Sequence, residues 1–264
     1  MSEIHGSVIT DDGVRLAYKT VGDGPRNLLL LHGWGGSANS WNAFIRALDL
    51  GEFRAIAYDI RGHGDSDKVT RGFTDERFAK DSLAVADAAS AAKFTIIGFS
   101  MSGRFVQYLP LLSPERVMGM VIVAGAPASA MELPEQVITD WAGRVGDREK
   151  LREVPVMFAV NPDPTLLDEY ADDAAKASRY ALEATLRMLS TSFEERIRGR
   201  SPVTPTLALA GKADKLLGSD VQKAIAANYP GSKVVELDCG HELLVEKPDE
   251  AARRVAEFVG TLPS

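Results

Sequence analysis

The chain has 264 residues, a formal net charge of −7 and 45% hydrophobic residues, a balance typical of a globular protein rather than a disordered one. At roughly 150 residues per domain, this length fits one large α/β domain or two small ones. Cys239 is the only cysteine, which excludes an intrachain disulfide and a multi-cysteine zinc site. No His-Glu-x-x-His motif is present, so we expect no metal site.

The distribution of charge and apolar residues argues against nucleic-acid and membrane partners. A nucleic-acid footprint needs clustered basic residues, and the nearest candidate, Arg196 with Arg198 and Arg200, is interpreted as the solvated end of a helix. The amino terminus has neither a basic region nor an apolar run, so no signal peptide is expected. The longest apolar stretch, 28–31, is too short to span a membrane. We therefore expect a cytoplasmic enzyme or binding protein.

Strand-like segments recur along the chain. Residues 7–22 predict a β-hairpin that turns at Asp11-Asp12-Gly13. Short continuous apolar runs follow, each succeeded by a turn or a helical stretch: 27–31, 54–58, 94–97, 118–124, 205–210 and 233–237. Such runs are typical of strands buried on both faces of a parallel sheet. The alternation of strand and helix predicts an α/β fold.

Helix signals lie between these runs. Thr74 followed by Asp75 and Glu76 predicts a capped helix that reaches about Ala92. Ser219 with Gln222 resembles a capping box, and Pro248 suits the first turn of a final helix that ends near Phe258. A helix is therefore expected after each of the last two strand-like runs.

One long region contains no convincing strand. Helical segments are expected at 134–145, 148–160 and 165–189. We predict a core domain formed by 1–126 and 201–264, with a helical cap, or lid, at 127–200. A purely structural decoration is the alternative, but an insertion of this length suggests a role. The residues interpreted as the apolar roof of a pocket are Trp141, Met157, Phe158 and Met188.

The sharpest chemical signal is Gly98-Phe99-Ser100-Met101-Ser102-Gly103, which follows the strand-like run 94–97 and precedes a helix-like stretch at 103–112. A sharp strand-to-helix turn with flanking glycines holds a serine in a strained conformation, with its hydroxyl at the carboxyl edge of the sheet. The helix amino terminus then stabilises negative charge that develops there. Ser100 is therefore the predicted nucleophile.

A serine nucleophile needs a base, and in this architecture the partners follow in the order Ser, Asp or Glu, His. His241 is the only histidine after Ser100, and it follows the run 233–237. Asp214 follows the preceding run and is predicted to accept the ring proton of His241. Asp220 and Asp238 remain the alternatives for that acid.

Main-chain donors are expected to hold the oxyanion of a tetrahedral intermediate. The N–H of Met101 is one, and the N–H of Trp34, in the glycine-rich segment 31–36, is the other. The residues predicted to line the substrate pocket are Trp34, Phe99, Met101, Trp141 and Phe158. Arg104 is interpreted as an ordinary first-turn helix residue, although it could meet an anionic group.

Together these segments resemble the α/β-hydrolase superfamily, in particular small cofactor-independent serine esterases with a helical cap. The resemblance rests on His32-Gly33 with Gly35-Gly36, the segment 59–66, the segment 98–103, Asp214 and His241. It implies an eight-stranded, mostly parallel sheet with cap helices after the sixth strand and no cofactor. Ser102, at a place often held by glycine, and Cys239, where small residues are frequent, depart from the usual pattern. Serine at position 100 argues against the haloalkane dehalogenases and epoxide hydrolases, which use a carboxylate nucleophile.

The sequence therefore predicts acyl transfer from a small carboxylic ester through Ser100, with a small-molecule ester as the partner. A lactonase or a carbon–carbon bond hydrolase would use the same three residues, and a ligand sensor would keep the fold. An NAD-dependent oxidoreductase is the alternative from another class, because segment 33–38 fits Gly-x-Gly-x-x-Ala and Asp59 follows about twenty residues on.

Overall fold

A computed structural model of the protein describes residues 3–198 and 204–263. Its sheet has the strand order β1-β2-β4-β3-β5-β6-β7-β8. The first hairpin and the β2–β4 pair are antiparallel, whereas all remaining neighbours are parallel. The strands are β1 (Glu3–Ile9), β2 (Arg15–Val21), β3 (Arg26–Leu31), β4 (Phe53–Tyr58), β5 (Phe94–Phe99), β6 (Val117–Val123), β7 (Thr206–Gly211) and β8 (Lys233–Leu237). The predicted α/β class and the mostly parallel eight-stranded sheet are confirmed.

The central strands are apolar throughout because both faces of the sheet are covered. Along β3, Leu29 and Leu31 pack into one core cluster, whereas Leu28 and Leu30 pack into a second cluster on the other face. This alternation follows from the two-residue period of a strand. Each of these four leucines is completely buried.

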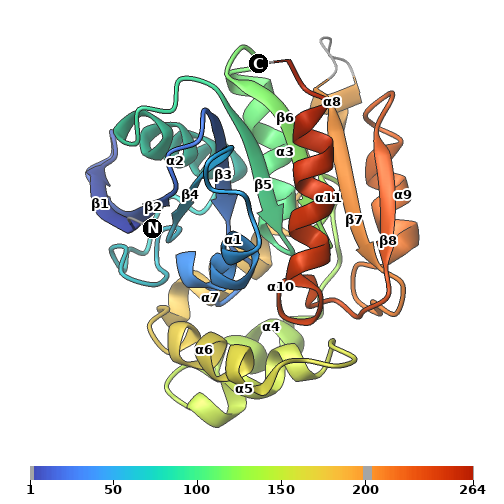
Figure 1. Ribbon diagram of the computed structural model, residues 1–264. Coiled ribbons are helices and arrows are strands. Elements are labelled where there is room, and N and C mark those ends of the chain that lie inside the picture. The colour runs from blue at the N-terminus through green and yellow to red at the C-terminus, as the bar shows by residue number, and fades with distance from the viewer. Residues whose placement is uncertain (1–2, 199–203, 264) are drawn as a thin grey trace.

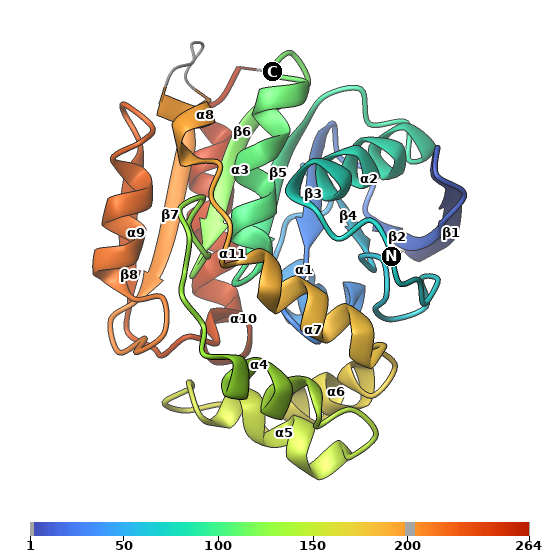
Figure 2. The same ribbon diagram turned by 180° about the vertical axis from the view of Figure 1, so that it is seen from behind.

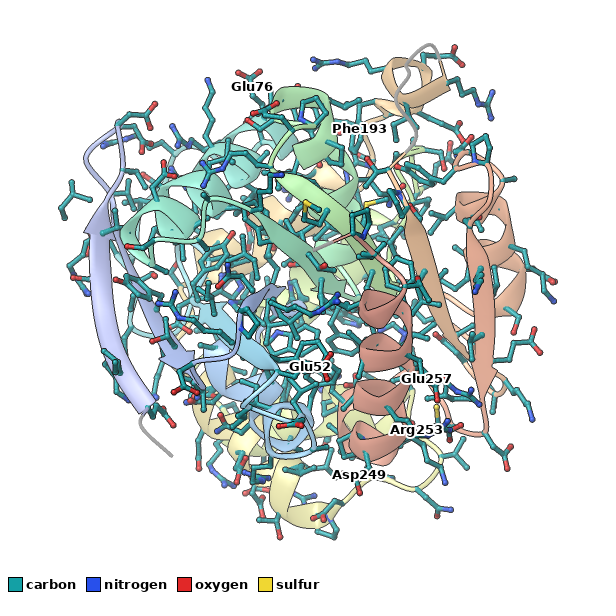
Figure 3. The ribbon with its side chains drawn as sticks, turned by 45° about the horizontal axis from the view of Figure 1, so that its top comes forward. Glu52, Glu76, Phe193, Asp249, Arg253 and Glu257 are labelled. Atoms are coloured by element: carbon teal, nitrogen blue, oxygen red, sulfur yellow. The ribbon has the colours of Figure 1, made fainter. Side chains whose placement is uncertain are left out.

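Helices lie on both faces of the sheet, as Figures 1 and 2 show from opposite sides. One face carries α1 (Asn42–Arg46), α10 (Leu243–Glu246) and α11 (Pro248–Gly260). The other carries α2 (Asp75–Ala88), α3 (Ser102–Leu112) and α9 (Ser219–Ala226). On its outer side α11 is charged: Asp249, Arg253 and Glu257 are exposed there, and Arg253 pairs with Glu257 at 2.7 Å (Figure 3).

Two helix starts were predicted correctly and one was not. Thr74 caps α2 by accepting the Arg77 N–H, and Pro248 occupies the first turn of α11. The capping box at Ser219 is wrong, because the helix begins after Gly218. The Gln222 side chain instead donates to the carbonyl of Leu217.

The segment between β6 and β7 forms a helical insertion, defined here as helices α4 to α8. They are α4 (Glu135–Ala142), α5 (Arg148–Val156), α6 (Pro164–Ala174), α7 (Arg179–Met188) and α8 (Glu194–Arg198). Both views show α4, α5 and α6 beyond one end of the sheet (Figures 1 and 2). The predicted helix at 165–189 is divided in two, because Ser178 turns out of the helix and caps α7. Arg200 lies outside the described residues.

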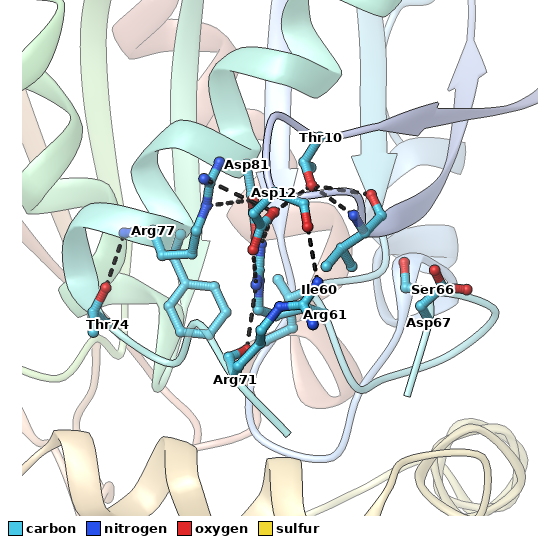
Figure 4. A network of polar contacts seen from close by, with 12 residues as sticks. Thr10, Asp12, Ile60, Arg61, Ser66, Asp67, Arg71, Thr74, Arg77 and Asp81 are labelled. Carbon is cyan, nitrogen blue, oxygen red and sulfur yellow. Dashed lines mark hydrogen bonds and ion pairs between the residues drawn. The ribbon is translucent and has the colours of Figure 1, made fainter. Parts of the chain in front are cut away.

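A buried ion-pair network joins the first hairpin to the rest of the fold (Figure 4). The Arg61 side chain, completely buried, donates to Asp81 through Nε at 2.7 Å and to Asp12 through Nη1 at 2.9 Å. Arg77 donates to the same Asp81 carboxylate at 2.9 Å. Arg61 thereby ties the loop after β4 to the β1–β2 turn and to α2.

Candidate active site

The predicted site residues meet at the carboxyl edge of the parallel strands. Loops that follow β3, β5, β7 and β8 carry Trp34, Ser100, Asp214 and His241 respectively. Parallel strands direct all their carboxyl ends to the same edge, so residues far apart in the sequence converge there. Helices α4, α5 and α6 of the insertion lie beyond this edge (Figure 1).

Ser100 stands on a strained turn between β5 and α3. Its φ is +51°, in the left-handed region that non-glycine residues rarely adopt. The tight crossing explains the flanking glycines. A Cβ on Gly98 would lie 2.4 Å from the carbonyl oxygen of Ser102, and one on Gly103 would lie 2.4 Å from the Cα of Gly125.

Ser102 does not line the cavity but has a structural contact. Its completely buried hydroxyl donates to the carbonyl of His32 at 2.5 Å, which joins the Ser100 turn to the loop after β3. Cys239 is likewise buried, and burial raises the pKa of its thiol to about 12. Neither departure from the usual family pattern changes the cavity wall directly.

A continuous row of hydrogen bonds links three of the predicted residues. His241 Nε2 lies 2.8 Å from Ser100 Oγ, and His241 Nδ1 lies 2.9 Å from Asp214 Oδ2. The other oxygen of Asp214 accepts the N–H groups of Leu216 and Leu217 at 2.7 and 2.9 Å. The alternatives Asp220 and Asp238 have exposed side chains, and the ring of His241 bonds to neither.

Burial and charge act in opposite directions on this row. Burial alone lowers the pKa of His241, but the hydrogen bond to Asp214 and the nearby carboxylates of Glu242 and Glu246 raise it above its usual value. Burial raises the pKa of Asp214, but the hydrogen bond and charge of His241 outweigh it, so the net pKa is lowered. Asp214 therefore stays ionised, and the protonated form of His241 is stabilised beside it.

Trp34 and Met101 carry the two main-chain donors that the sequence predicts for an oxyanion. Within the described residues, neither the N–H of Trp34 nor that of Met101 has a hydrogen-bond acceptor. Met101 directly precedes α3, so its N–H is at the positive end of a helix dipole. Unpartnered amides beside a serine hydroxyl are suited to an oxyanion.

The insertion is bonded to the loops that carry these groups. Trp34 donates its indole N–H to the carbonyl of Leu182 in α7 at 2.9 Å, and its own carbonyl accepts the hydroxyl of Tyr170 in α6 at 3.0 Å. The main-chain N–H of His241 donates to the carbonyl of Phe158 at 2.9 Å. The helices after β6 thus hold both the Trp34 loop and the His241 loop.

A cavity of about 70 Å³ at Ser100 gives room for a small ligand. Trp34, Phe99, Trp141 and Phe158, four of the residues predicted to bind substrate, line it. Further lining residues that the sequence analysis did not identify include Asn39, Ser40, Val154, Leu166, Glu169, Tyr170, Asp173, Leu216, Glu242, Leu244 and Val245. Of these residues, Glu242 is the one that the sequence could have indicated, since it directly follows the predicted base.

Other expectations for the cavity are not met by the packing. The Met101 side chain is buried in the core between the sheet and α3 and is not among the lining residues. Met188 is also in the core, whereas Met157 is 46% exposed on the outside of the insertion. Arg104 neither faces solvent nor meets the cavity: it is completely buried and pairs with Asp75 at 2.8 Å.

The glycine-rich loop after β3 is not arranged to hold a dinucleotide. Asp59, the acid that would bind a ribose, accepts the N–H of Ala38 at 2.7 Å and that of Asp65 at 2.6 Å. A Cβ on Gly33 would lie 2.9 Å from the Phe99 ring, and one on Gly35 would lie 2.7 Å from the Tyr170 hydroxyl. These glycines allow close packing of side chains rather than the approach of a pyrophosphate.

Among residues 3–198 and 204–263, no group of three or more His, Cys, Asp or Glu side chains is placed to hold a metal ion. None of the helices in that part of the chain has the length and apolar character required to cross a membrane.

Comparisons with known proteins agree with this fold. Residues 26–156 match a family model described as the alpha/beta hydrolase fold. The chain is 26% identical to a pimeloyl-[acyl-carrier protein] methyl ester esterase of Serratia marcescens, covering 92% of this chain and 98% of that protein. It is also 26% identical to a 2-hydroxy-6-oxononadienedioate/2-hydroxy-6-oxononatrienedioate hydrolase of Paraburkholderia xenovorans, covering 94% and 92%.

Two other matches extend the comparison. The chain is 27% identical to a dihydrolipoyllysine-residue acetyltransferase component of Pseudomonas putida, over 90% of this chain but 64% of that protein's length. An esterase structure from Exiguobacterium antarcticum superposes with a TM-score of 0.87 at 18% identity, covering 98% and 100% of the two chains, which shows the fold. The chain belongs to the α/β-hydrolase superfamily, and the esterases and hydrolases among its relatives support hydrolase activity.

Proposed function

We propose that the protein is a serine hydrolase that cleaves a small carboxylic ester through an acyl-enzyme on Ser100. The observation that carries this proposal is the row of hydrogen bonds from Asp214 through His241 to Ser100, at 2.9 and 2.8 Å. A serine hydroxyl is a weak nucleophile until a base removes its proton, and this row supplies both the base and the group that orients it.

In the first half-reaction, His241 Nε2 takes the hydroxyl proton of Ser100 while the serine oxygen bonds to the ester carbonyl carbon. Asp214 accepts the hydrogen bond of the Nδ1–H group of His241 and stabilises the imidazolium that forms. The N–H groups of Trp34 and Met101 hold the oxyanion of the tetrahedral intermediate. The carbon–oxygen bond to the alcohol then breaks, and His241 gives its proton to the departing alkoxide oxygen.

The second half-reaction repeats these steps with water. His241 removes a proton from water, whose oxygen bonds to the acyl carbon. The intermediate collapses, the bond to Ser100 breaks, and the serine oxygen recovers a proton from His241. The products are the free carboxylic acid and the enzyme in its starting state.

The cavity favours a small, uncharged acyl group over a dicarboxylate. The Paraburkholderia relative acts, by its name, on a dioate, whereas the described lining residues of this cavity include Glu169, Asp173 and Glu242 but no lysine or arginine. Carboxylates brought close to a dianion repel it. A lactone keeps a neutral ester bond and is the second candidate within the same chemistry.

The insertion is proposed to act as a cap over the site. Trp141 of α4 and Phe158, which follows α5, line the cavity together with Ser100. Their rings pack against one another with centroids 5.6 Å apart. An apolar roof of this kind excludes water from the acyl-enzyme until the leaving group departs.

Hydrolysis of p-nitrophenyl esters of increasing acyl length tests the proposal. Ser100→Ala is expected to remove nearly all turnover, whereas Ser102→Ala, the matched neighbour, keeps a Ser100-dependent activity because its hydroxyl bonds to His32 instead. A fluorophosphonate is expected to add covalently to Ser100 and to no other serine by peptide mass analysis. Turnover of Ser100→Ala near the wild-type level would refute the proposed nucleophile.

A further inference from the structure

The cavity wall contains an acidic side chain that the proposed mechanism does not use. Glu242 is 9% exposed and lines the cavity beside His241. Within residues 3–198 and 204–263 its carboxyl group has no hydrogen-bond or ion-pair partner. The carboxyl group of this largely buried residue has no partner among the described protein side chains, so it is available to a cationic ligand in the cavity.

The surroundings of Glu242 are acidic rather than basic. Asp173 and Glu169 line the same cavity, and no lysine or arginine is among its described lining residues. Asp173 is already bonded to Ser37 at 2.6 Å and to Lys176 at 3.3 Å, whereas Glu169 is exposed. Glu242 is therefore the buried acid that remains available for a ligand.

Aromatic rings complete the cavity. Trp34 and Trp141 lie with ring centroids 5.7 Å apart, and Phe158 lies 5.6 Å from Trp141 and 6.2 Å from the ring of His241. The faces of such rings attract cations, and a group of them is suited to a quaternary ammonium. The rings and the carboxyl group of Glu242 line the same cavity.

We propose that Glu242 and the surrounding aromatic rings form a subsite for an alkylammonium group, so that the preferred substrates are small esters that carry a positive charge. That the ligand is an ester rests on the proposed function. Binding of a cation at the subsite does not require turnover. The subsite predicts that cationic esters are preferred over neutral esters. It also predicts that esters carrying a carboxylate are disfavoured.

The ionisation of Glu242 is coupled to the groups that face it. Burial, together with the charges of Glu246 and Asp214, raises the pKa of Glu242 to about 7, although the charge of His241 lowers it. Burial raises the pKa of Tyr170, whose hydroxyl donates to the carbonyl of Trp34, and the charge of Glu242 raises it further. A bound cation favours the ionised carboxylate, so the subsite is strongest above neutral pH.

Matched substrates test the subsite at about pH 8, where most of Glu242 is ionised. Choline acetate ester and 3,3-dimethylbutyl acetate have the same shape and differ in charge, and a monosuccinate ester adds the carboxylate case. The wild-type kcat/KM is expected to favour the choline ester by about tenfold or more over the neutral isostere. Glu242→Gln is expected to remove most of that ratio, whereas Glu115→Gln, the same charge change at an exposed site before β6, leaves the ratio unchanged.

Binding to a protein that cannot turn over separates the two proposals. Choline binding to Ser100→Ala, followed by tryptophan fluorescence, is expected to weaken about tenfold when Glu242→Gln is added. Binding without any ester hydrolysis would support the subsite and refute the proposed function. Ser100-dependent hydrolysis of neutral esters with an equal or better kcat/KM than for the choline ester would refute the subsite alone.

Discussion

Replacing Arg61 by methionine tests how much the buried network of Figure 4 contributes to the fold. Arg61 is completely buried, and its guanidinium holds Asp81, also completely buried, through Nε at 2.7 Å and Nη2 at 2.8 Å. Burial raises the pKa of Asp81 in spite of Arg61 and Arg77, so the cost of dehydration already exceeds the attraction. Arg61→Met leaves that carboxylate with Arg77 as its cationic partner and also removes the bond to Asp12.

The expected cost follows from the exposure of the partners. Removing one member of a fully buried pair costs about 3–5 kcal/mol, because the other charge stays buried. For a chain of this size, each kcal/mol lowers Tm by about 2 °C, so Arg61→Met is expected to lower Tm by roughly 6–10 °C. None of these network residues lines the cavity, so the activity of the folded variant should match the wild type.

The measurement is equilibrium unfolding in urea followed by tryptophan fluorescence, with refolding checked by recovery of ester turnover. The double variant Arg61→Met with Asp81→Leu removes both charges and is expected to recover at least half of the loss. A single variant destabilised by less than about 1 kcal/mol, or a double variant as unstable as the single one, would refute the reasoning.

Two further predictions concern His241 and the segment that follows it. The acid limb of the kcat/KM pH profile should lie above about pH 6.5, the ordinary pKa of histidine, because only neutral His241 accepts a proton and its pKa is raised. Glu242→Gln removes a neighbouring negative charge and should move this limb to lower pH. A limb that does not move would contradict the assignment of His241 as the base. Glu246→Ala removes the carboxylate that accepts three main-chain N–H groups, from Gly240 and from the loop at 160–161. The free energy of unfolding of this variant should fall by about 1–3 kcal/mol, since those bonds are partly exposed. Limited proteolysis should then cut near 157–161 sooner than in wild type. Equal cleavage rates would contradict this role of the Glu246 hydrogen bonds.

The site residues predicted most directly are those with a local pattern. The Ser100 turn was identifiable because a strand-like run, a strained turn and a helix occur within one short segment. His241 followed by elimination, since it is the only histidine after Ser100. That Ser100, His241 and Asp214 form one hydrogen-bonded row is a finding of the structure, and their catalytic roles stay predictions.

The cavity wall depended on packing that no local pattern contains. In the sequence, Met101 and Met188 are apolar residues just as Trp141 and Phe158 are. In the structure the two methionines lie in the core, whereas Trp141 and Phe158 line the cavity. Which side of a helix faces the sheet depends on the angle at which the insertion docks. That angle is set by contacts such as the indole of Trp34 with Leu182, between residues far apart in the sequence.

The sequence by itself determined the α/β class, the strands and the order of the chemical groups, because these depend on local hydrophobic period, turn residues and spacing. Only the tertiary structure decided that Arg104 is buried in an ion pair with Asp75, that Asp59 is occupied by loop amides, and that Glu242 is left without a partner beside His241. A residue's partner is chosen by three-dimensional packing among many chemically equivalent groups. The sequence supplies those groups, but burial and distance decide which of them remain free to bind a ligand.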